Sequence, residues 1–458
     1  MSKYQAYPEY KDSGNRLLGE IPKHWQLTRI KYVAEITPKK PRVDRQQMCS
    51  FIPMEKLKTN SIVLDEIRQI GDVYDGYTYF ANNDILMAKV TPCFENKNIA
   101  IAKGLINQIG FGSSEIYPIR VNEKTNNRFL FYRLQEDGFM ELAIGAMTGA
   151  GGLRRVPSET LANYIYALPA YEEQEKIASF LDHETAKIDT LIDKQQQLIQ
   201  LLKEKRQAVI SHAVTKGLNP NAPMRDSGVE WLGEVPEHWE VGRYKFCTSR
   251  VVVGIAEAAT HAYAETGVPI IRSTNIREEG LDLSGMLFIK IEFAELNSSK
   301  YLYTNDVITV RTGYPGTSAV IPESLDKSQC FTNLVATPKK EMSPHFLSEY
   351  LNSHTGKSYF DLLGWGSAQK NISVPILQNI SIAWPEISEQ KEIVSYIKQQ
   401  RERYTKLVAM GEKQIGLLQE RRTALISAAV TGKIDVRHPV CHPTGDLQSS
   451  KATVHGDL

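Results

Sequence analysis

The chain has 458 residues, of which 42% are hydrophobic and 23% are charged, so it is long enough for two or three domains and has the composition of an ordered globular protein. Its formal net charge is only +1, which excludes a globally basic surface that wraps nucleic acid, so any DNA-binding face must be local. The chain has five single cysteines without a CxxC pair, which argues against a disulfide framework and a zinc site. It lacks an apolar stretch of about 18 residues and a signal peptide, which argues against a membrane span and favours a cytoplasmic protein.

The chain repeats itself once. The segment KDSGNRLLGEIPKHWQLTRIK, residues 11–31, returns as RDSGVEWLGEVPEHWEVGRYK, residues 225–245, with 11 identities at 21 positions. A second matched segment ends with residues 199–215 and 415–431, which share 11 identities at 17 positions. Because solenoids stack three or more short repeats, two long copies indicate a duplication with internal pseudo-twofold symmetry.

Between the matched segments the two copies differ. Residues 32–167 and 245–383 contain short β-branched and aromatic runs, such as DVITVRT, that are separated by Gly, Pro and Asn. This pattern is typical of small, mostly β domains with some helix.

A long helix is predicted after each β domain. From Glu172 to about Lys216 there is no Pro or Gly, and a helix of about 44 residues would be about 66 Å long. The second copy repeats the apolar stripe, although Gly411 and Gly416 are expected to weaken its middle. The stripe residues are Ile177, Leu181, Ile188, Leu191, Leu198, Leu202 and Val209, and then Ile393, Ile397, Tyr404, Leu407, Leu418 and Leu425. Because neither helix can bury its stripe alone, the two are expected to pair; the alternative is that each packs only on its own domain.

The expected fold is therefore α+β, with two tandem mostly β domains, each followed by a long helix, and with the two helices paired as an antiparallel coiled coil with pseudo-twofold symmetry. The expected divisions are an N-terminal frame with the first β domain (1–168), a central helical spacer (169–218), the second β domain (219–384), a C-terminal helical spacer (385–436) and a polar tail (437–458). The tail is expected to be disordered, and a metal site formed by its His438, Cys441 and His442 is a weak alternative.

No known catalytic motif accompanies this organisation. The sequence lacks a GxxxxGK phosphate loop, an HExxH zinc pair, a GxSxG elbow, a Gly-rich dinucleotide turn and an NPPY-type methyltransferase motif. The TGK tripeptide at Thr431 has no preceding glycine at the required spacing. These absences favour a binding protein over a self-sufficient nuclease or methyltransferase.

Three motifs carry a family resemblance. They are the DSG…LGEIPxHW opening at Asp12, the EEQxxIxxFLD helix start at Glu172 and the AVTGKID ending at Ala429. With them, the chain from about Lys11 to Val436 resembles the specificity (S) subunit of type I restriction-modification systems. Four loop motifs inside the β domains are also similar to loops of this family: TPCFENKNIAIA, GSSEIYPIR, VRTGYPGTSAVIP and GSAQKNIS.

The resemblance implies a non-catalytic subunit that binds double-stranded DNA, with each β domain reading one half of a split, asymmetric site. The helices would fix the gap between the halves and dock two modification (methyltransferase) subunits. Usually two restriction (endonuclease and translocase) subunits complete the complex. No cofactor is expected in this chain, because S-adenosylmethionine, ATP and Mg²⁺ would belong to the partner subunits. The alternative is a scaffold that binds no DNA, with two ligand-binding β domains on a coiled coil.

Polar residues of Gly-rich loops are the expected DNA contacts, because backbone can approach DNA closely there and side chains can reach base edges. The candidates are Lys89, Thr91, Asn96, Lys97, Ser113, Ser114, Arg154 and Arg155 in the first β domain, and, by resemblance to the family's loops, Arg311, Tyr314, Ser367, Gln369, Lys370 and Asn371 in the second. Asn and Gln suit adenine and Arg suits guanine.

Some of these assignments have plain structural alternatives. Arg154 and Arg155 follow the flexible run GAMTGAGGL and are either DNA contacts or ordinary surface arginines. Trp25 and Trp239 are possible stacking platforms, but their repetition in both copies favours packing on the frame. The basic residues of the helices are either phosphate or partner contacts or a solvated face; they are Lys203, Lys205, Arg206, Arg421 and Arg422.

Overall fold

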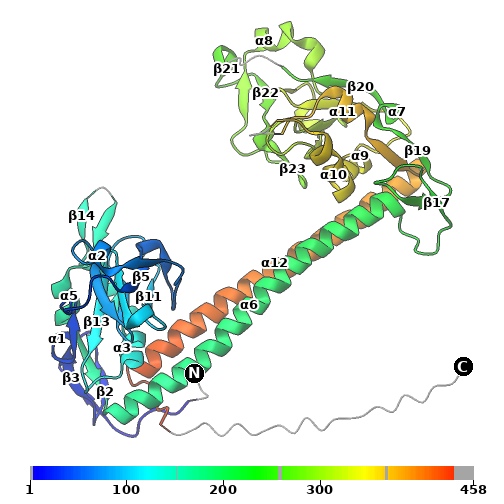
Figure 1. Ribbon diagram of the computed structural model, residues 1–458. Coiled ribbons are helices and arrows are strands. Elements are labelled where there is room, and N and C mark those ends of the chain that lie inside the picture. The colour runs from blue at the N-terminus through cyan, green and yellow to red at the C-terminus, as the bar shows by residue number, and fades with distance from the viewer. Residues whose placement is uncertain (1–3, 151, 256–259, 367–369, 438–458) are drawn as a thin grey trace, which may run out of the picture. The chain divides into compact units, whose positions relative to one another are not determined.

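The computed structural model describes residues 4–150, 152–255, 260–366 and 370–437. The chain forms two compact units, of which unit 1 consists of residues 1–194 and 414–458 and unit 2 of residues 195–413 (Figure 1). Unit 1 is therefore completed by both ends of the chain, whereas unit 2 is one continuous segment. The tail beyond Arg437, with His438, Cys441 and His442, lies outside the described residues, so its disorder and its metal ligands stay predictions.

Unit 1 begins with a frame of short strands that brings the two ends of its β domain together. In this frame β1 pairs with β2 and β3 pairs with β16, both antiparallel. Between them lie an antiparallel sheet of order β11-β10-β13-β4 and a sheet of order β8-β5-β12-β9, in which β12 runs parallel to β5. The strands are β1 (Tyr10–Asp12), β2 (Glu20–Pro22), β3 (Gln26–Arg29), β4 (Ala34–Ile36), β5 (Met48–Ile52), β6 (Leu57–Lys58), β7 (Ser61–Ile62), β8 (Ile67–Gln69), β9 (Thr78–Ala81), β10 (Ile85–Ala88), β11 (Ile99–Ile101), β12 (Ile109–Gly112), β13 (Ile116–Val121), β14 (Thr148–Ala150), β15 (Leu153–Arg155) and β16 (Ile165–Leu168).

Helices complete unit 1 and share its core. Asn126 caps α3, since its side chain accepts from the backbone N–H groups of the first turn, which have no partner inside the helix. One hydrophobic core includes Trp25 of the frame, Phe129 of α3, Ile177 of α6 (Tyr171–Lys216) and Ile426 of α12 (Ile387–Val430), so both long helices contribute to it. The shorter helices are α1 (Ile30–Val33), α2 (Ile70–Val73), α3 (Asn127–Arg133), α4 (Asp137–Gly145) and α5 (Ser158–Asn163).

Unit 2 repeats this plan. Its frame pairs β17 with β18 and β19 with β30, and its two sheets have the orders β20-β29-β26-β27 and β21-β25-β22-β28, with β22 parallel to β28. The strands are β17 (Met224–Asp226), β18 (Glu234–Pro236), β19 (Glu240–Arg243), β20 (Thr248–Val253), β21 (Tyr263–Ala264), β22 (Val268–Ile271), β23 (Ile276–Arg277), β24 (Gly280–Leu281), β25 (Leu287–Ile289), β26 (Val307–Thr309), β27 (Ser318–Val320), β28 (Gln329–Cys330), β29 (Leu334–Pro338) and β30 (Ser381–Trp384). The shorter helices are α7 (Tyr244–Cys247), α8 (Ile291–Leu296), α9 (Pro344–Asn352), α10 (His354–Leu363) and α11 (Val374–Asn379).

The two long helices are α6 (Tyr171–Lys216) and α12 (Ile387–Val430), which confirms the predicted helix after each β domain. In unit 1 the start of α6 packs against the end of α12, where Arg422 Nε donates to Asp189 Oδ1 at 2.8 Å. In unit 2 the end of α6 and the start of α12 line one hydrophobic core. The helices are therefore antiparallel partners, as predicted, and do not pack on separate domains. Among the described helices, none is long and apolar enough to cross a bilayer.

The two glycines of α12 do not interrupt the helix. Gly411 faces α6 in unit 2, and a Cβ atom there would lie 2.9 Å from Ile199 Cγ1, whereas a Cβ at Gly416 would meet nothing within 4 Å. Ordinary carbon contacts are about 3.5–4.0 Å long. The absence of a side chain at Gly411 thus lets α6 and α12 approach, and this glycine tightens the pairing that it was expected to weaken.

Candidate nucleic-acid interface

A buried carboxylate joins the frame of unit 1 to its long helix. Glu173, in the first turn of α6, accepts from Trp25 Nε1 at 3.1 Å and from the Tyr7 hydroxyl at 2.7 Å, and lies 2.8 Å from His24 Nε2. Burial, together with the bond to Glu173, raises the pKa of Tyr7, so its hydroxyl remains a donor. Trp25 is completely buried.

Unit 2 has the same arrangement at the same place in the frame. Glu389, in the first turn of α12, accepts from Trp239 Nε1 at 3.1 Å and lies 2.9 Å from His238 Nε2. Trp239 is only 1% exposed. A buried indole cannot stack on a base, so the expectation that Trp25 and Trp239 pack on the frame is confirmed.

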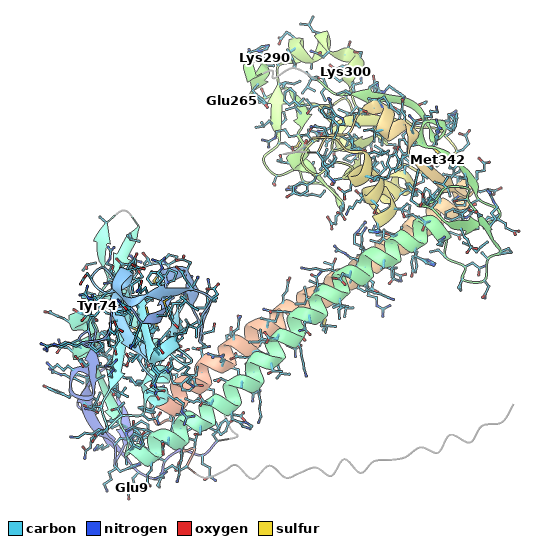
Figure 2. The ribbon with its side chains drawn as sticks, in the orientation of Figure 1. Glu9, Tyr74, Glu265, Lys290, Lys300 and Met342 are labelled. Atoms are coloured by element: carbon cyan, nitrogen blue, oxygen red, sulfur yellow. The ribbon has the colours of Figure 1, made fainter. Side chains whose placement is uncertain are left out.

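The glutamine after each of these carboxylates ties the helix to the β domain. Gln174 Oε1 accepts from the backbone N–H of Asn126 at 2.8 Å. In unit 2, Gln390 Oε1 accepts from the backbone N–H of Ser343 at 2.8 Å, beside Met342, which Figure 2 labels. Both glutamines are fully buried. The EEQ motif at Glu172 and the matching Ser-Glu-Gln at residues 388–390 therefore join each β domain to the helix that follows it.

Four of the predicted contact residues of unit 1, Lys89, Thr91, Arg154 and Arg155, lie at one hairpin, the ribbon formed by β14 and β15. The residues of both strands are exposed, and in Figure 1 the ribbon extends away from the two sheets. Thr91 holds its base, since Thr91 Oγ1 donates to the carbonyl oxygen of Gly152 at 2.8 Å and accepts from the Arg154 N–H at 3.0 Å. The Val156 N–H donates to the carbonyl oxygen of Lys89 at 2.8 Å. Lys89, Thr91 and the end of the ribbon are thus one assembly.

Each arginine at the end of the ribbon meets a glutamate. Arg154 Nη2 donates to Glu95 Oε1 at 2.8 Å. Arg155 donates through Nε to Glu115 Oε2 and through Nη2 to Glu115 Oε1, both at 2.9 Å. The hydrogen bond from Arg155 holds the pKa of Glu115 below its usual range. The run expected to be flexible therefore forms, in its described residues, a hairpin whose arginines are held in place.

The other predicted residues of unit 1 differ in their surroundings. Ser113 and Ser114 form the turn between β12 and β13, where Ser113 closes the turn through its side chain and Ser114 is exposed. Asn96 is exposed on the loop after β10. Lys97, on the same loop, turns to the start of α4 and donates to Asp137 Oδ1 at 3.0 Å, so its charge is engaged within the domain.

In unit 2 the predicted residues lie on two loops that touch. The residue after Asn371 donates its N–H to the carbonyl oxygen of Arg311 at 3.1 Å, and Thr312 Oγ1 donates to Asn371 Oδ1. Tyr314, on the first loop, is 85% exposed. Lys370, on the second, donates to a carboxylate of α10 at 3.1 Å. The structure therefore brings the described candidates of unit 2 together.

Two of the predicted contact residues are not described by the structure, and three further residues near the candidate loops were not singled out from the sequence. Ser367 and Gln369 lie outside the described residues. Trp365, two positions before Ser367 in the sequence, is 58% exposed, and its position between two glycines was the available clue. Glu95 and Glu115 sit inside the quoted loop motifs, but an acidic side chain does not suggest a DNA contact until its arginine is found.

The two loop clusters occupy equivalent positions in their units. The carbonyl oxygen of Lys89 accepts from the residue after Arg155, and that of Arg311 accepts from the residue after Asn371. The residues that follow Lys89 and Arg311 form β-bridges with Arg155 and Asn371, respectively. Lys89 thus corresponds to Arg311, and the side chain is basic in both units, whereas Arg155 corresponds to Asn371 and the side chain differs.

The basic run of the helices divides into two groups. Arg422 pairs across the helices in unit 1, and Arg206 lies 3.9 Å from a glutamate of the β23–β24 turn in unit 2. Lys203, Lys205 and Arg421 are exposed. The two arginines have an acidic partner within their own unit, whereas the other three side chains are exposed on the helices.

Comparisons with known proteins agree with this organisation. The model of the family described as "Type I restriction modification DNA specificity domain" matches residues 22–201 and 255–414. The EcoAI and EcoEI specificity subunits of Escherichia coli are 37% and 33% identical over 193 residues, which is 40% of this chain. The match spans only 33% and 32% of those relatives. The MjaVIII specificity subunit of Methanocaldococcus jannaschii is 23% identical over 430 residues, 91% of this chain and 95% of the relative.

Solved structures share the fold. One is a chain of the type I R-M system, solved to explain complex assembly and conformational transition; it is 16% identical, has a TM-score of 0.71 and is matched over 98% of its length and 90% of this chain. The HsdS subunit from Thermoanaerobacter tengcongensis is also 16% identical with the same coverage, at a TM-score of 0.55. The predicted fold class is confirmed.

Proposed function

Because this chain belongs to the family of the type I restriction modification DNA specificity domain, we propose that it is the DNA-specificity subunit of a type I restriction-modification complex. The β domain of each unit reads one half of a bipartite, asymmetric DNA site. One observation carries the proposal. Both units repeat the hydrogen bond from a buried tryptophan of the frame to a glutamate of the long helix, yet Arg155 of unit 1 stands where unit 2 has Asn371. A repeated frame with exchanged loop side chains suits two readers of different bases.

The side chains of the two clusters have the chemistry for this task. Arginine forks onto O6 and N7 of guanine, and asparagine onto N6 and N7 of adenine. The basic residue common to both units, Lys89 or Arg311, suits a phosphate contact that carries no sequence information. Two small clusters of this kind also reconcile DNA binding with a net charge of +1.

The paired helices set the spacing and carry the partners. Half-sites that lie one helical turn of DNA apart, about 34 Å, or a multiple of it, need a rigid spacer, which a flexible linker cannot provide. Units with the same plan offer two similar surfaces to two modification subunits, which methylate adenine with S-adenosylmethionine. Two restriction subunits supply ATP- and Mg²⁺-dependent translocation and cleavage. This chain itself binds no cofactor and catalyses no step.

Genome-wide methylation mapping, in cells with and without this chain, tests the proposal. The expected result is a two-part methylated motif that depends on the chain. Replacing residues 32–167 with the corresponding domain of a relative is expected to change one half of the motif and leave the other intact. A continuous motif, or a change in both halves, contradicts the proposal. Co-purification of the chain with a protein that carries an NPPY-type methyltransferase motif would count against the scaffold alternative.

A further inference from the structure

The pair formed by Arg155 and Glu115 leaves part of the guanidinium available. The carboxylate binds Nε and Nη2, each at 2.9 Å, which is the side edge of the planar group. A guanidinium has five N–H donors, and its end edge, formed by Nη1 and Nη2, is a second two-donor fork. That end edge points away from Glu115, and the Arg155 side chain is 44% exposed. The pair holds the guanidinium while keeping a fork for another acceptor.

Both members of the pair stand on fixed backbone. The Lys89 N–H donates to the carbonyl oxygen of Glu115 at 3.0 Å, and the Glu115 N–H donates to Ser113 Oγ at 3.1 Å. Arg155 is tied to the same place, because the next residue donates to the carbonyl oxygen of Lys89. A long side chain held in this way has lost most of its rotamer freedom before it meets a ligand.

The charge of the pair favours a base edge over a phosphate. Arg155, and to a smaller extent the neighbouring Lys89, lower the pKa of Glu115, so the carboxylate is ionised at neutral pH and offsets the charge of Arg155, which leaves Lys89 as the cation suited to a phosphate. A phosphate that approached Arg155 would also meet the negative charge of Glu115. Guanine presents two neutral acceptors in the major groove, O6 and N7, at the spacing of an arginine fork.

The buried arginine–carboxylate pairs beside the sheets of the two β domains look different. Asp84 in unit 1 and Asp306 in unit 2 are almost completely buried, and each binds an arginine. The two aspartates occupy equivalent positions, just before β10 and β26, although the arginine comes from β13 in unit 1 and from β20 in unit 2, so a buried aspartate at this point is common to both β domains. Arg155 has no such repetition, because Asn371 stands in its place and the turn of unit 2 at residues 331–333 has no acidic residue. The pair belongs to what differs between the units.

We propose that Glu115 is a positioning residue for DNA readout, which holds Arg155 so that its Nη1–Nη2 edge binds O6 and N7 of one guanine in the half-site read by unit 1. This inference rests on the proposed function. Glu115 itself contacts Arg155 and not the base, and the specificity that it adds is confined to a single base pair.

The test uses the chain assembled with its modification subunits, and exchanges each base pair of the unit 1 half-site in turn. For the unaltered chain, initial methylation rates should fall about 5- to 150-fold at one G·C pair, the value of a bidentate contact. Arg155→Gln is expected to abolish the preference at that pair only. Glu115→Gln is expected to reduce it by about fivefold or more, since a neutral partner holds the guanidinium less firmly. The freed arginine can then reach a phosphate, so binding to unrelated DNA should become tighter and its salt dependence steeper, by up to about 0.9 in slope.

Glu66→Gln is the matched control. Glu66 pairs with Arg68 at 2.6 Å in unit 1 and is 29% exposed, against 27% for Glu115, and its replacement is expected to change no base preference. The half-site read by unit 2 reports in every complex that the chain has folded and assembled. If Glu115→Gln does not assemble, Arg155→Lys serves as the second variant. It keeps the positive charge without the two-donor fork and is expected to lose the preference at the same base pair.

Three results would overturn the inference. The first is an unaltered base preference at every base pair in Glu115→Gln or Arg155→Lys. The second is a loss of base preference that is spread over both half-sites. The third is a uniform loss of DNA affinity with a shallower salt dependence in Arg155→Gln, which marks a phosphate contact. A wild-type complex that shows no two-part motif would instead refute the proposed function.

Discussion

Replacing Gly411 or Gly416 by alanine is expected to change the stability of the protein in opposite directions, although the two glycines lie five positions apart in the same helix. Replacing a glycine by alanine inside a helix is worth about 0.8–1.0 kcal/mol of stability, because alanine loses less backbone entropy. Around Gly416 there is open space, so Gly416→Ala should gain this amount. At Gly411 the new Cβ would lie 2.9 Å from Ile199 Cγ1 and 3.2 Å from Ile199 Cδ1.

The magnitude at Gly411 follows from that contact. The Cβ would sit at least about 0.6 Å inside an ordinary carbon contact, against an isoleucine that is 8% exposed. Overpacking of this kind typically costs about 1–3 kcal/mol. After the helix-propensity gain, Gly411→Ala should range from neutral to about 2 kcal/mol less stable, and the two variants should differ by about 1–3 kcal/mol.

Urea unfolding of the purified chain, followed by the far-ultraviolet helical signal, measures both changes. The comparison requires that the dependence of unfolding free energy on urea is the same in all three proteins. A Gly411→Ala variant that is stabilised as much as Gly416→Ala would refute the close approach of α6 and α12 at this point. The reasoning that assigns the glycine to helix pairing would then fail.

Glu173→Gln should lower the unfolding free energy by about 1–3 kcal/mol, because buried donors lose a charged acceptor. Urea unfolding measures this loss. The control is Glu9→Gln, at an exposed position (Figure 2), which is expected to leave the unfolding free energy unchanged. Deleting about one helical turn from both α6 and α12 shortens the helix pair by about 5.4 Å, which corresponds to about one to two base pairs at about 3.4 Å each. Methylation mapping should then find an unread gap that is shorter by this amount. An unchanged gap would contradict the role of the helices as a spacer. Burial raises the pKa of Cys330 to about 12, so at pH 8 only about one thiol in 10⁴ is the reactive thiolate. Mass spectrometry after iodoacetamide should show the less buried Cys93 labelled before Cys330 in the native chain and Cys330 labelled only after unfolding, whereas fast native labelling of Cys330 would show that its core is open.

Repetition made the frame predictable from the sequence. Trp25 and Trp239 recur in matched segments, and side chains that serve one structural purpose in both copies are retained together; the indoles prove to be buried on Glu173 and Glu389. The long helices were predictable because their apolar spacing extends over many turns. The role of Gly411 was not, since helix propensity describes a single helix and not the neighbour that packs against it.

The candidate loops were found, but the roles within them depend on contacts distant in sequence. Thr91 is a buried brace for the ribbon, and Lys97 pairs with Asp137, 40 positions away. Arg155 and Glu115 are also 40 positions apart, and no periodicity or motif joins them. Short loop motifs locate a surface, whereas the partner of each charge follows from the sheet that places the loops side by side.

The two units place different side chains at equivalent positions, 155 and 371, without a change of fold. Backbone hydrogen bonds fix positions 155 and 371 against the carbonyl oxygens of Lys89 and Arg311 in the same way. The side chains placed there need different support. Arginine has several rotatable bonds and is costly to immobilise, which is why Arg155 requires the two bonds to Glu115; the short side chain of Asn371 is oriented by its neighbour Thr312. Under the proposal that Arg155 reads a base, a new specificity at this position needs the base-contacting side chain and the residue that supports it to change together, while the frame is retained.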